Sequence, residues 1–182
     1  MLRIIGGTFR GRKLKTLKGL ATRPVLGRVR EALFNVLGNI EGLRVLDLYA
    51  GSGAIGIEAL SRGADSAVFV DSGFRQCRII RDNLDIVGIH AEVIRLDSVS
   101  AVDRFRKSGS MFDFVFADPP YEKGLGVEIL NAVCVSGIVT GNGLMALTVR
   151  QSEEISATAG SWEQIFNRRY GDTRLVMFSA RR

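Results

Sequence analysis

From residue 43 onward, short apolar runs alternate with stretches of helical spacing, and this alternation constrains the fold most. The apolar runs cover 43–48, 67–70, 92–96, 112–117 and 144–149, and the helical stretches cover 54–62, 73–87, 98–107 and 124–136. Such alternation is typical of parallel sheets with helices on both faces. The segments 163–170 and 174–179 flank Gly171-Asp172, a hairpin signal. We therefore predict an α/β, Rossmann-like, doubly wound sheet of seven mostly parallel strands that ends in an antiparallel C-terminal hairpin.

Residues 1–40 differ from the rest of the chain in charge. They hold nine Lys/Arg and one acidic residue, for a net charge of +8, whereas residues 41–182 carry a net charge of −2. Short strand candidates at 3–5 and 12–14 surround a Gly-rich turn and predict a β-hairpin. Apolar residues at helical spacing over 26–37 predict a helix that ends at Gly38. We expect an N-terminal extension over 1–40 and a main domain over 41–182.

A cationic extension beside a near-neutral body suits a polyanion, because each Lys or Arg that contacts a phosphate releases condensed counterions. A solvated basic surface explains the charge equally well. Glycines and Phe9 interleave with the cations and favour RNA, since they allow close backbone approach and base stacking. No amphipathic helix carries these charges, which disfavours a membrane surface. The candidate RNA-binding residues are Arg3, Arg10, Arg12, Lys13, Arg23, Arg28 and Arg30.

Composition and cysteine spacing exclude several classes of protein. With 46% hydrophobic residues, the chain is too apolar to be disordered. Cys77 and Cys134 lie far apart without a CxxC pattern, so we expect reduced thiols rather than a disulfide framework or a zinc site. No apolar run approaches the roughly 18 residues of a membrane span, and the N-terminus lacks the apolar block of a signal peptide. We expect a soluble, cytoplasmic protein without a metal.

A glycine-rich loop follows the first strand of the predicted sheet. Gly51, Gly53 and Gly56 satisfy the pattern G-x-G-x-x-G, which also fits a dinucleotide site. Asp47, at the carboxyl end of that strand, would repel an anionic pyrophosphate. S-adenosylmethionine instead carries an ammonium and a sulfonium and no phosphate, so the carboxylate favours it. We expect Asp71, at the end of the second strand, to hold the ribose, and Asp97, after the third, to reach the adenine amino group.

The fourth strand runs directly into Asp118-Pro119-Pro120-Tyr121. Two consecutive prolines cannot continue a central strand, so the chain must leave the sheet here in a rigid turn. The Asp118 carboxylate and the Pro119 carbonyl can accept hydrogen bonds from an exocyclic amine and stabilise the positive charge that develops when the amine attacks a methyl group. Tyr121 can stack on the base and fix its position. This pattern predicts methyl transfer to a nucleobase amine.

Asp47-Leu-Tyr-Ala-Gly-Ser-Gly and Asp118-Pro-Pro-Tyr together resemble class I S-adenosylmethionine-dependent methyltransferases that act on an exocyclic amine. Further motifs over essentially the whole chain resemble the RsmD family: Arg3-Ile-Ile-Gly-Gly, Arg10-Gly-Arg-Lys-Leu, Thr22-Arg-Pro, Arg28-Val-Arg-Glu-Ala-Leu-Phe-Asn, Gly56-Ile-Glu-Ala-Leu-Ser-Arg-Gly-Ala and Tyr170-Gly-Asp-Thr-Arg-Leu. The resemblance implies transfer of a methyl group to N2 of one guanine in bacterial 16S ribosomal RNA. It further implies an assembling 30S particle as the partner and a monomeric enzyme.

By the same resemblance, one set of residues would bind the cofactor: Asp47, Tyr49, Ala50, Gly51, Ser52, Gly53, Asp71, Asp97, Ser98 and Asn35. The turn Asp118, Pro119, Pro120 and Tyr121 would orient the guanine amine. Three residues depart from the family pattern: Val25 and Gly27 replace a Thr and an Asp beside the expected substrate entrance, and Asp71 replaces a Glu. The shorter Asp71 would have to make the ribose contact.

Three other functions remain compatible with parts of the pattern. An N6-adenine methyltransferase acting on RNA or DNA would use the same turn, so only the extension favours guanine. A nucleotide-dependent oxidoreductase would use the glycine loop, but Asp47 disfavours it. An RNA-binding protein with a vestigial pocket would need neither Asp47 nor Asp118.

Overall fold

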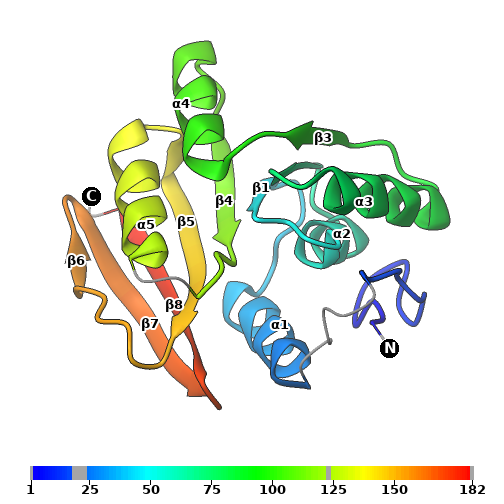
Figure 1. The fold of residues 1–182 in the computed structure, drawn as a ribbon, viewed down its shortest axis with the longest axis horizontal. Helices are drawn as coiled ribbons and strands as arrows, with labels where there is room; N and C mark the ends of the chain where they lie inside the picture. The colour runs from blue at the N-terminus through cyan, green and yellow to red at the C-terminus, as the bar shows by residue number, and fades with distance from the viewer. Residues whose placement is uncertain (1, 18–23, 122–123, 181–182) are drawn as a thin grey trace.

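The computed structural model describes residues 2–17, 24–121 and 124–180, and within these ranges the chain forms a single sheet with helices on both faces (Figure 1). The strands are β1 (Arg44–Leu48), β2 (Ser66–Asp71), β3 (Glu92–Arg95), β4 (Phe112–Ala117), β5 (Val139–Arg150), β6 (Thr158–Ala159), β7 (Trp162–Tyr170) and β8 (Thr173–Ala180). The helices are α1 (Pro24–Leu37), α2 (Ala54–Ser61), α3 (Phe74–Val87), α4 (Ser98–Ser108) and α5 (Leu125–Ser136).

The strands lie in the order β3-β2-β1-β4-β5-β8-β7-β6, and β1 to β5 run parallel to one another. The pairs β5–β8, β7–β8 and β6–β7 are antiparallel, so the doubly wound sheet and its C-terminal hairpin are confirmed. The predicted number of seven strands is wrong by one. The eighth, β6, is a two-residue edge strand, too short to produce an alternating apolar pattern.

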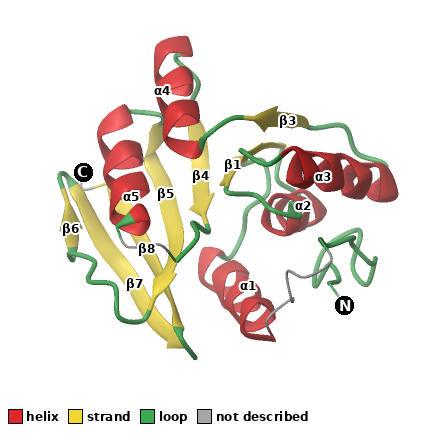
Figure 2. Cartoon of the chain, viewed as in Figure 1, coloured by secondary structure: helices red, strands yellow, loops and turns green. Residues whose placement is uncertain are grey.

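Alternating side chains of the central strands build two separate hydrophobic layers, as a pleated strand requires. On β4, Val115 and Ala117 face the layer under α4 and α5, whereas Phe114 and Phe116 face the layer under α1, α2 and α3. Figure 2 shows α4 and α5 over one side of the sheet, with α1 to α3 apart from them. Among the described residues, no helix is both long and apolar enough to cross a bilayer.

The N-terminal segment is mostly loop rather than the predicted hairpin (Figure 2). A single antiparallel bridge joins Arg3 and Lys13, and the backbone N–H of Ile4 donates to the carbonyl of Arg12 over 3.1 Å. The ladder stops there because the N–H of Arg12 donates to the carbonyl of Phe9 within the turn, and the N–H of Gly11 donates to the carbonyl of Ile4 in its place. The N–H groups of Ile5 and Gly6 donate to the two carboxylate oxygens of Glu58 on α2, over 2.8 and 2.7 Å.

Glu58 therefore joins the N-terminal segment to the main body. Its side chain is fully buried and also accepts a hydrogen bond from Arg62 Nε over 2.8 Å. Arg30 on α1 lies 3.9 Å from the same carboxylate, and its guanidinium donates to the carbonyl of Arg3. Helix α1, helix α2 and the N-terminal segment thus meet at one buried ionic cluster. The domain division at residue 40 stays a prediction, but the described parts of 1–40 share this cluster with the rest of the chain.

Glu58→Ala should lower the free energy of unfolding by about 3 kcal/mol, because it leaves a buried arginine and two backbone donors without their acceptor. Urea denaturation measures the loss, and trypsin should cleave the variant faster within residues 2–17. Asp103→Ala is the matched control, since it removes an equal charge from an exposed ion pair with Arg106 and Lys107. Equal stability of the two variants would contradict the role of Glu58.

Candidate active site

The chain reverses its direction of travel across the sheet between β1 and β4. From β1 it moves outward through β2 to β3, then returns to β4 on the other side of β1. Ligands of doubly wound sheets bind at the carboxyl ends of the strands at such a switch point. Leu48 pairs with Ala117 at these ends, and the N–H of Asp118 lies 3.4 Å from the carbonyl oxygen of Leu48. The glycine loop and the Asp-Pro-Pro-Tyr turn therefore start side by side.

The glycine loop turns tightly from β1 into α2. Gly53 caps the helix with a φ of 74°, in the left-handed region that glycine adopts most easily. Gly56 lies against β2, where an added Cβ would come within 2.3 Å of the ring of Phe69. The first residue allows the turn and the second allows the helix to pack closely on the sheet. Ala50, Gly51 and Ser52 form the bend between β1 and this helix.

Asp47 and Asp71 hold the loop through its backbone. The carboxylate of Asp47, 2% exposed, accepts a hydrogen bond from the N–H of Gly56 over 2.9 Å. The two oxygens of Asp71 accept from Gly51 and Gly73 over 2.9 and 2.8 Å. Two loop donors that a pyrophosphate would require are thus engaged by carboxylates, which disfavours a dinucleotide. The ribose contact of Asp71 stays a prediction.

The carboxylates also set the electrostatics of the site. Burial, followed by the nearby charges of Asp118 and Asp71, raises the pKa of Asp47 well above its ordinary value, against the lowering effect of the Gly56 hydrogen bond. A cationic ligand among these groups offsets their mutual repulsion, whereas an anionic one increases it. The donor set therefore fits the ammonium and sulfonium of S-adenosylmethionine.

Tyr49, Asp97 and Ser98 meet on the far side of the loop. Tyr49 has a φ of 56°, unusual for a residue other than glycine and costly in free energy. Burial and the charge of Asp97 raise the pKa of the Tyr49 phenol, and the buried Ser98 nearby lowers it. Asp97 is exposed and caps α4 by accepting from the N–H of Ser100 over 3.0 Å. These three predicted cofactor residues lie beside the loop, as their sequence positions require.

Two threonines hydrogen-bond to the turn Asp118-Pro119-Pro120-Tyr121, which we call the acceptor turn. The sequence did not predict either of them. Thr148 on β5 donates to Oδ1 of Asp118, and the hydroxyl of Tyr121 hydrogen-bonds to that of Thr173 on β8. Pro119 is buried and Pro120 exposed. A polar residue inside the apolar run 144–149 was the available signal for Thr148.

A third missed residue connects the N-terminal segment to the glycine loop. Asn83 on α3 is fully buried, and its Nδ2 donates to the carbonyls of Lys15 and Ser52 over 3.0 and 2.9 Å. Its Oδ1 accepts from the N–H of Lys15 over 2.7 Å. No local sequence pattern predicts these hydrogen bonds, because Lys15 and Ser52 are 68 and 31 residues away from Asn83 in the chain.

The predicted RNA-binding residues divide into three groups. Arg3, Arg10, Arg12, Lys13 and Arg28 are exposed. Arg23 lies outside the described residues. Arg30 was wrongly assigned to RNA: it is 6% exposed and bound to Glu58 and the Arg3 carbonyl, because it occupies the inward face of α1.

Two residues of α1 that the sequence analysis singled out are exposed. Asn35 is exposed, and its cofactor contact stays a prediction. Gly27, where the family pattern has Asp, is exposed in the first turn of the helix, and an added Cβ there would meet no atom within 4 Å.

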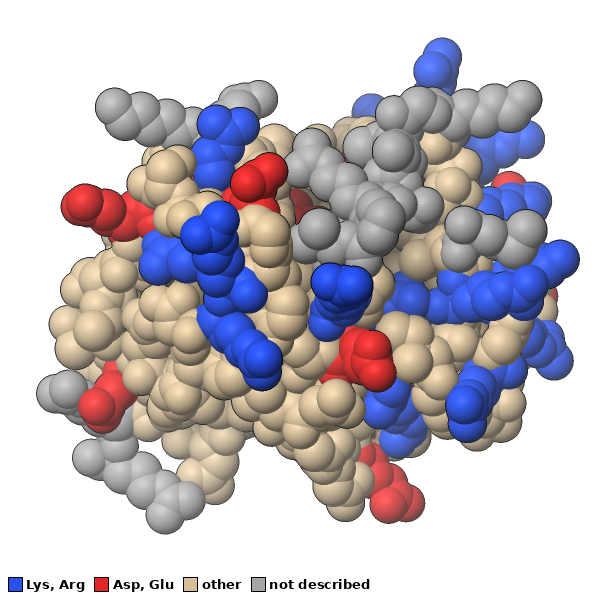
Figure 3. All heavy atoms as spheres, turned by 90° about the horizontal axis from the view of Figure 1, so that it is seen from below, with Lys and Arg blue, Asp and Glu red and all other residues tan. Residues whose placement is uncertain are grey.

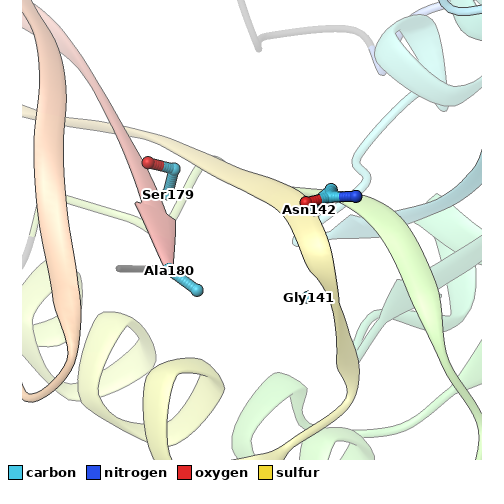
Figure 4. A pocket seen from close by; sticks show the side chains of 5 residues that line it. Gly141, Asn142, Ser179 and Ala180 are labelled. Atoms are coloured by element: carbon cyan, nitrogen blue, oxygen red, sulfur yellow. The ribbon is translucent and has the colours of Figure 1, made fainter. Parts of the chain in front are cut away.

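A separate hollow lies at the opposite end of the sheet. Gly141, Asn142 and Gly143 near the start of β5 line it, together with Ser179 and Ala180 near the end of β8 (Figure 4). Thr148 lies at the other end of β5, so this hollow is distinct from the acceptor turn. Among the described residues, no group of His, Cys, Asp and Glu could hold a metal ion.

Asp47→Asn keeps an oxygen acceptor for Gly56 but removes the titration. Because the pKa of Asp47 is raised in the folded chain, its ionisation lowers the free energy of unfolding as pH rises from about 4, the ordinary pKa of the carboxyl, toward the folded pKa. The stability of the variant relative to the wild type should therefore increase over this window. Urea denaturation at a series of pH values measures the difference in free energy of unfolding between the variant and the wild type. A difference that does not change with pH would contradict the raised pKa of Asp47.

Comparison with known proteins agrees with this geometry. The family model described as Conserved hypothetical protein 95 matches residues 2–179. YlbH of Bacillus subtilis (strain 168) is 33% identical over 99% of this chain and 100% of its own length. Ribosomal RNA small subunit methyltransferase D of Escherichia coli (strain K12) is 33% identical over 88% of this chain and 81% of its own.

Solved structures show the same fold. The structure of yhhF from Escherichia coli superposes with a TM-score of 0.88 at 31% identity, covering 99% of this chain and 98% of its own. SMU.776, determined in complex with SAH, has a TM-score of 0.69 over 83% of this chain and 48% of its own; at 14% identity it shows the fold alone. With a family model that spans nearly the whole chain, and relatives above 30% identity, this chain belongs to the RsmD family.

Proposed function

We propose that this chain transfers a methyl group from S-adenosylmethionine to the exocyclic N2 amine of a guanine in 16S ribosomal RNA. The observation that carries the proposal is the Asp118-Pro-Pro-Tyr turn, which leaves β4 beside the glycine loop at the switch point of the sheet. Membership of the RsmD family, and the name of its Escherichia coli relative, support ribosomal RNA of the small subunit as the substrate. We further propose that the chain acts as a cytoplasmic monomer on an assembling 30S particle.

The chain's own residues bind and orient the reactants. Asp47, Asp71 and the loop they hold would bind the cofactor, which supplies an electrophilic methyl group on its sulfonium. The Asp118 carboxylate and the Pro119 carbonyl would accept hydrogen bonds from the two N–H groups of the amine, which favours a pyramidal nitrogen and stabilises its developing positive charge. Tyr121 would stack on the base. The target base must leave its stack to reach the turn, at a cost of a few kcal/mol that is smallest in a loop.

Asp118→Ala should lower the rate of methyl transfer at least about 100-fold, because the amine loses its charged acceptor. Binding of S-adenosylhomocysteine should remain near that of the wild type. Transfer of labelled methyl groups to small-subunit particles measures the rate, and calorimetry measures binding. Asp113→Ala, at the other end of β4, is the control and should keep its rate. A wild-type rate in Asp118→Ala would refute the proposed role.

Nucleoside analysis of the labelled product tests the base and atom directly. Particles from cells lacking this protein provide the unmodified substrate. N2-methylguanosine would support the proposal. N6-methyladenosine would keep the chemistry and overturn the guanine assignment, because the turn can receive either amine.

The exposed cations of the N-terminal segment are suited to RNA phosphates, but they are not equivalent. The guanidinium of Arg3 donates to the carbonyl of Gly11, and that of Arg12 to the carbonyl of Ile86, so both also fix the backbone. No hydrogen bond or ion pair involves the side chains of Arg10 and Lys13 among the described residues. These two are therefore the better tests of RNA binding.

A second group of cations lies near the turn between β7 and β8, apart from the N-terminal segment (Figure 1). Arg150 on β5 and Arg168 on β7 are exposed, near the hairpin turn between β7 and β8. Figure 3 views this end of the molecule and shows Lys and Arg side chains gathered on both sides of its middle. Arg28 on α1 is exposed as well. We propose that the RNA contacts both the cations of the N-terminal segment and those near the β7–β8 turn.

Arg10→Gln/Lys13→Gln and Arg150→Gln/Arg168→Gln should each weaken binding of the substrate RNA. The slope of log affinity against log salt should become shallower by about 0.7–0.9 for each lost phosphate contact. Arg104→Gln/Arg106→Gln on α4 removes the same charge from another face and is the control. Filter binding over a range of salt concentrations measures all three. Slopes that match the control would assign the cations to a solvated surface.

A further inference from the structure

Two neighbouring strands present threonine hydroxyls on the same face of the sheet. In the antiparallel pair β5–β8, Thr148 lies opposite Leu175 and Arg150 lies opposite Thr173. Residues two apart on a strand share a face, so Thr148 and Thr173 are diagonal neighbours. They belong to the face of α1, since Leu175 is part of the hydrophobic layer under that helix. Their side chains are 1% and 3% exposed, respectively.

Each hydroxyl contacts a different residue of the acceptor turn. Thr148 donates to Oδ1 of Asp118, 30 residues earlier in the chain, and Thr173 hydrogen-bonds to the hydroxyl of Tyr121, 52 residues earlier. A threonine on a strand has few χ1 rotamers, so its hydroxyl direction is fixed by the sheet. A hydroxyl that donates to a carboxylate forms a charge-assisted bond, stronger than one between neutral groups.

We propose that Thr148 and Thr173 are positioning residues for methyl transfer. Thr148 fixes the plane of the Asp118 carboxylate, and Thr173 fixes the ring of Tyr121, so the β5–β8 pair helps to orient both residues of the turn. The inference rests on the proposed function, because it assigns the amine to Asp118 and the base to Tyr121. A displacement of about 1 Å at such a site can cost a factor of about 100 in rate.

Substitutions at Thr148 separate the hydroxyl from its packing. Thr148→Val keeps the branched side chain and should lower kcat about 10- to 100-fold, with unchanged affinity for S-adenosylhomocysteine and unchanged KM for the particles. Thr148→Ser keeps the hydroxyl and should restore most of kcat. Thr140→Val is the matched control: it removes the 3.1 Å bond from Thr140 to Asp113 at the other end of the β4–β5 pair. Wild-type kcat in Thr148→Val, or equal loss in Thr148→Ser, would overturn the role of Thr148.

A double-mutant cycle tests the second contact. Thr173→Val and Tyr121→Phe each remove one side of the same hydrogen bond, so each should slow single-turnover transfer and the double variant should be no slower than either. Additive losses, or no loss in the single variants, would overturn the role of Thr173. The wild-type product is identified in parallel. If that product is N6-methyladenosine, only the guanine assignment is refuted, since the rate comparisons between variants hold for either amine.

Discussion

The arrangement of the site depends on a carboxylate buried at the end of β1. The Asp47 carboxylate accepts a hydrogen bond from the N–H of Gly56, and the Asp71 carboxylate accepts one from the N–H of Gly51. In phosphate-binding loops, such backbone donors bind the ligand instead. The arrangement reverses the charge preference of a glycine-rich loop. Because the charges of Asp118 and Asp71 repel that of Asp47, a cation is the ligand that this site favours.

The sequence predicted the elements well because local spacing determines them. The apolar run 112–117 became β4 without a change of bounds, and the stretch 73–87 became α3 from Phe74 to Val87. Parallel order followed from the alternation itself, since each crossover must place its helix on the sheet. The glycine loop and the acceptor turn were also predictable, because the end of a strand places them at a known edge.

Buried polar partners were not predictable, because they lie far apart in the chain. Glu58 reads as an ordinary helical acid, yet its donors Ile5 and Gly6 are more than 50 residues away. The same carboxylate explains the error at Arg30, which lies against Glu58 instead of on the surface where RNA was expected. Charge counting cannot distinguish a surface arginine from one that neutralises a buried acid.

Asn83 connects the cationic N-terminal segment to the glycine loop. One amide nitrogen, fully enclosed on α3, donates both to Lys15 in the cationic segment and to Ser52 in the glycine loop. A shift of the Lys15 backbone must either carry this amide along or leave a buried polar group unpaired, at a cost of about 1–3 kcal/mol. The segment is therefore held at a fixed position relative to the loop. RNA bound to these cations would be positioned relative to the cofactor by the protein core rather than by a flexible extension.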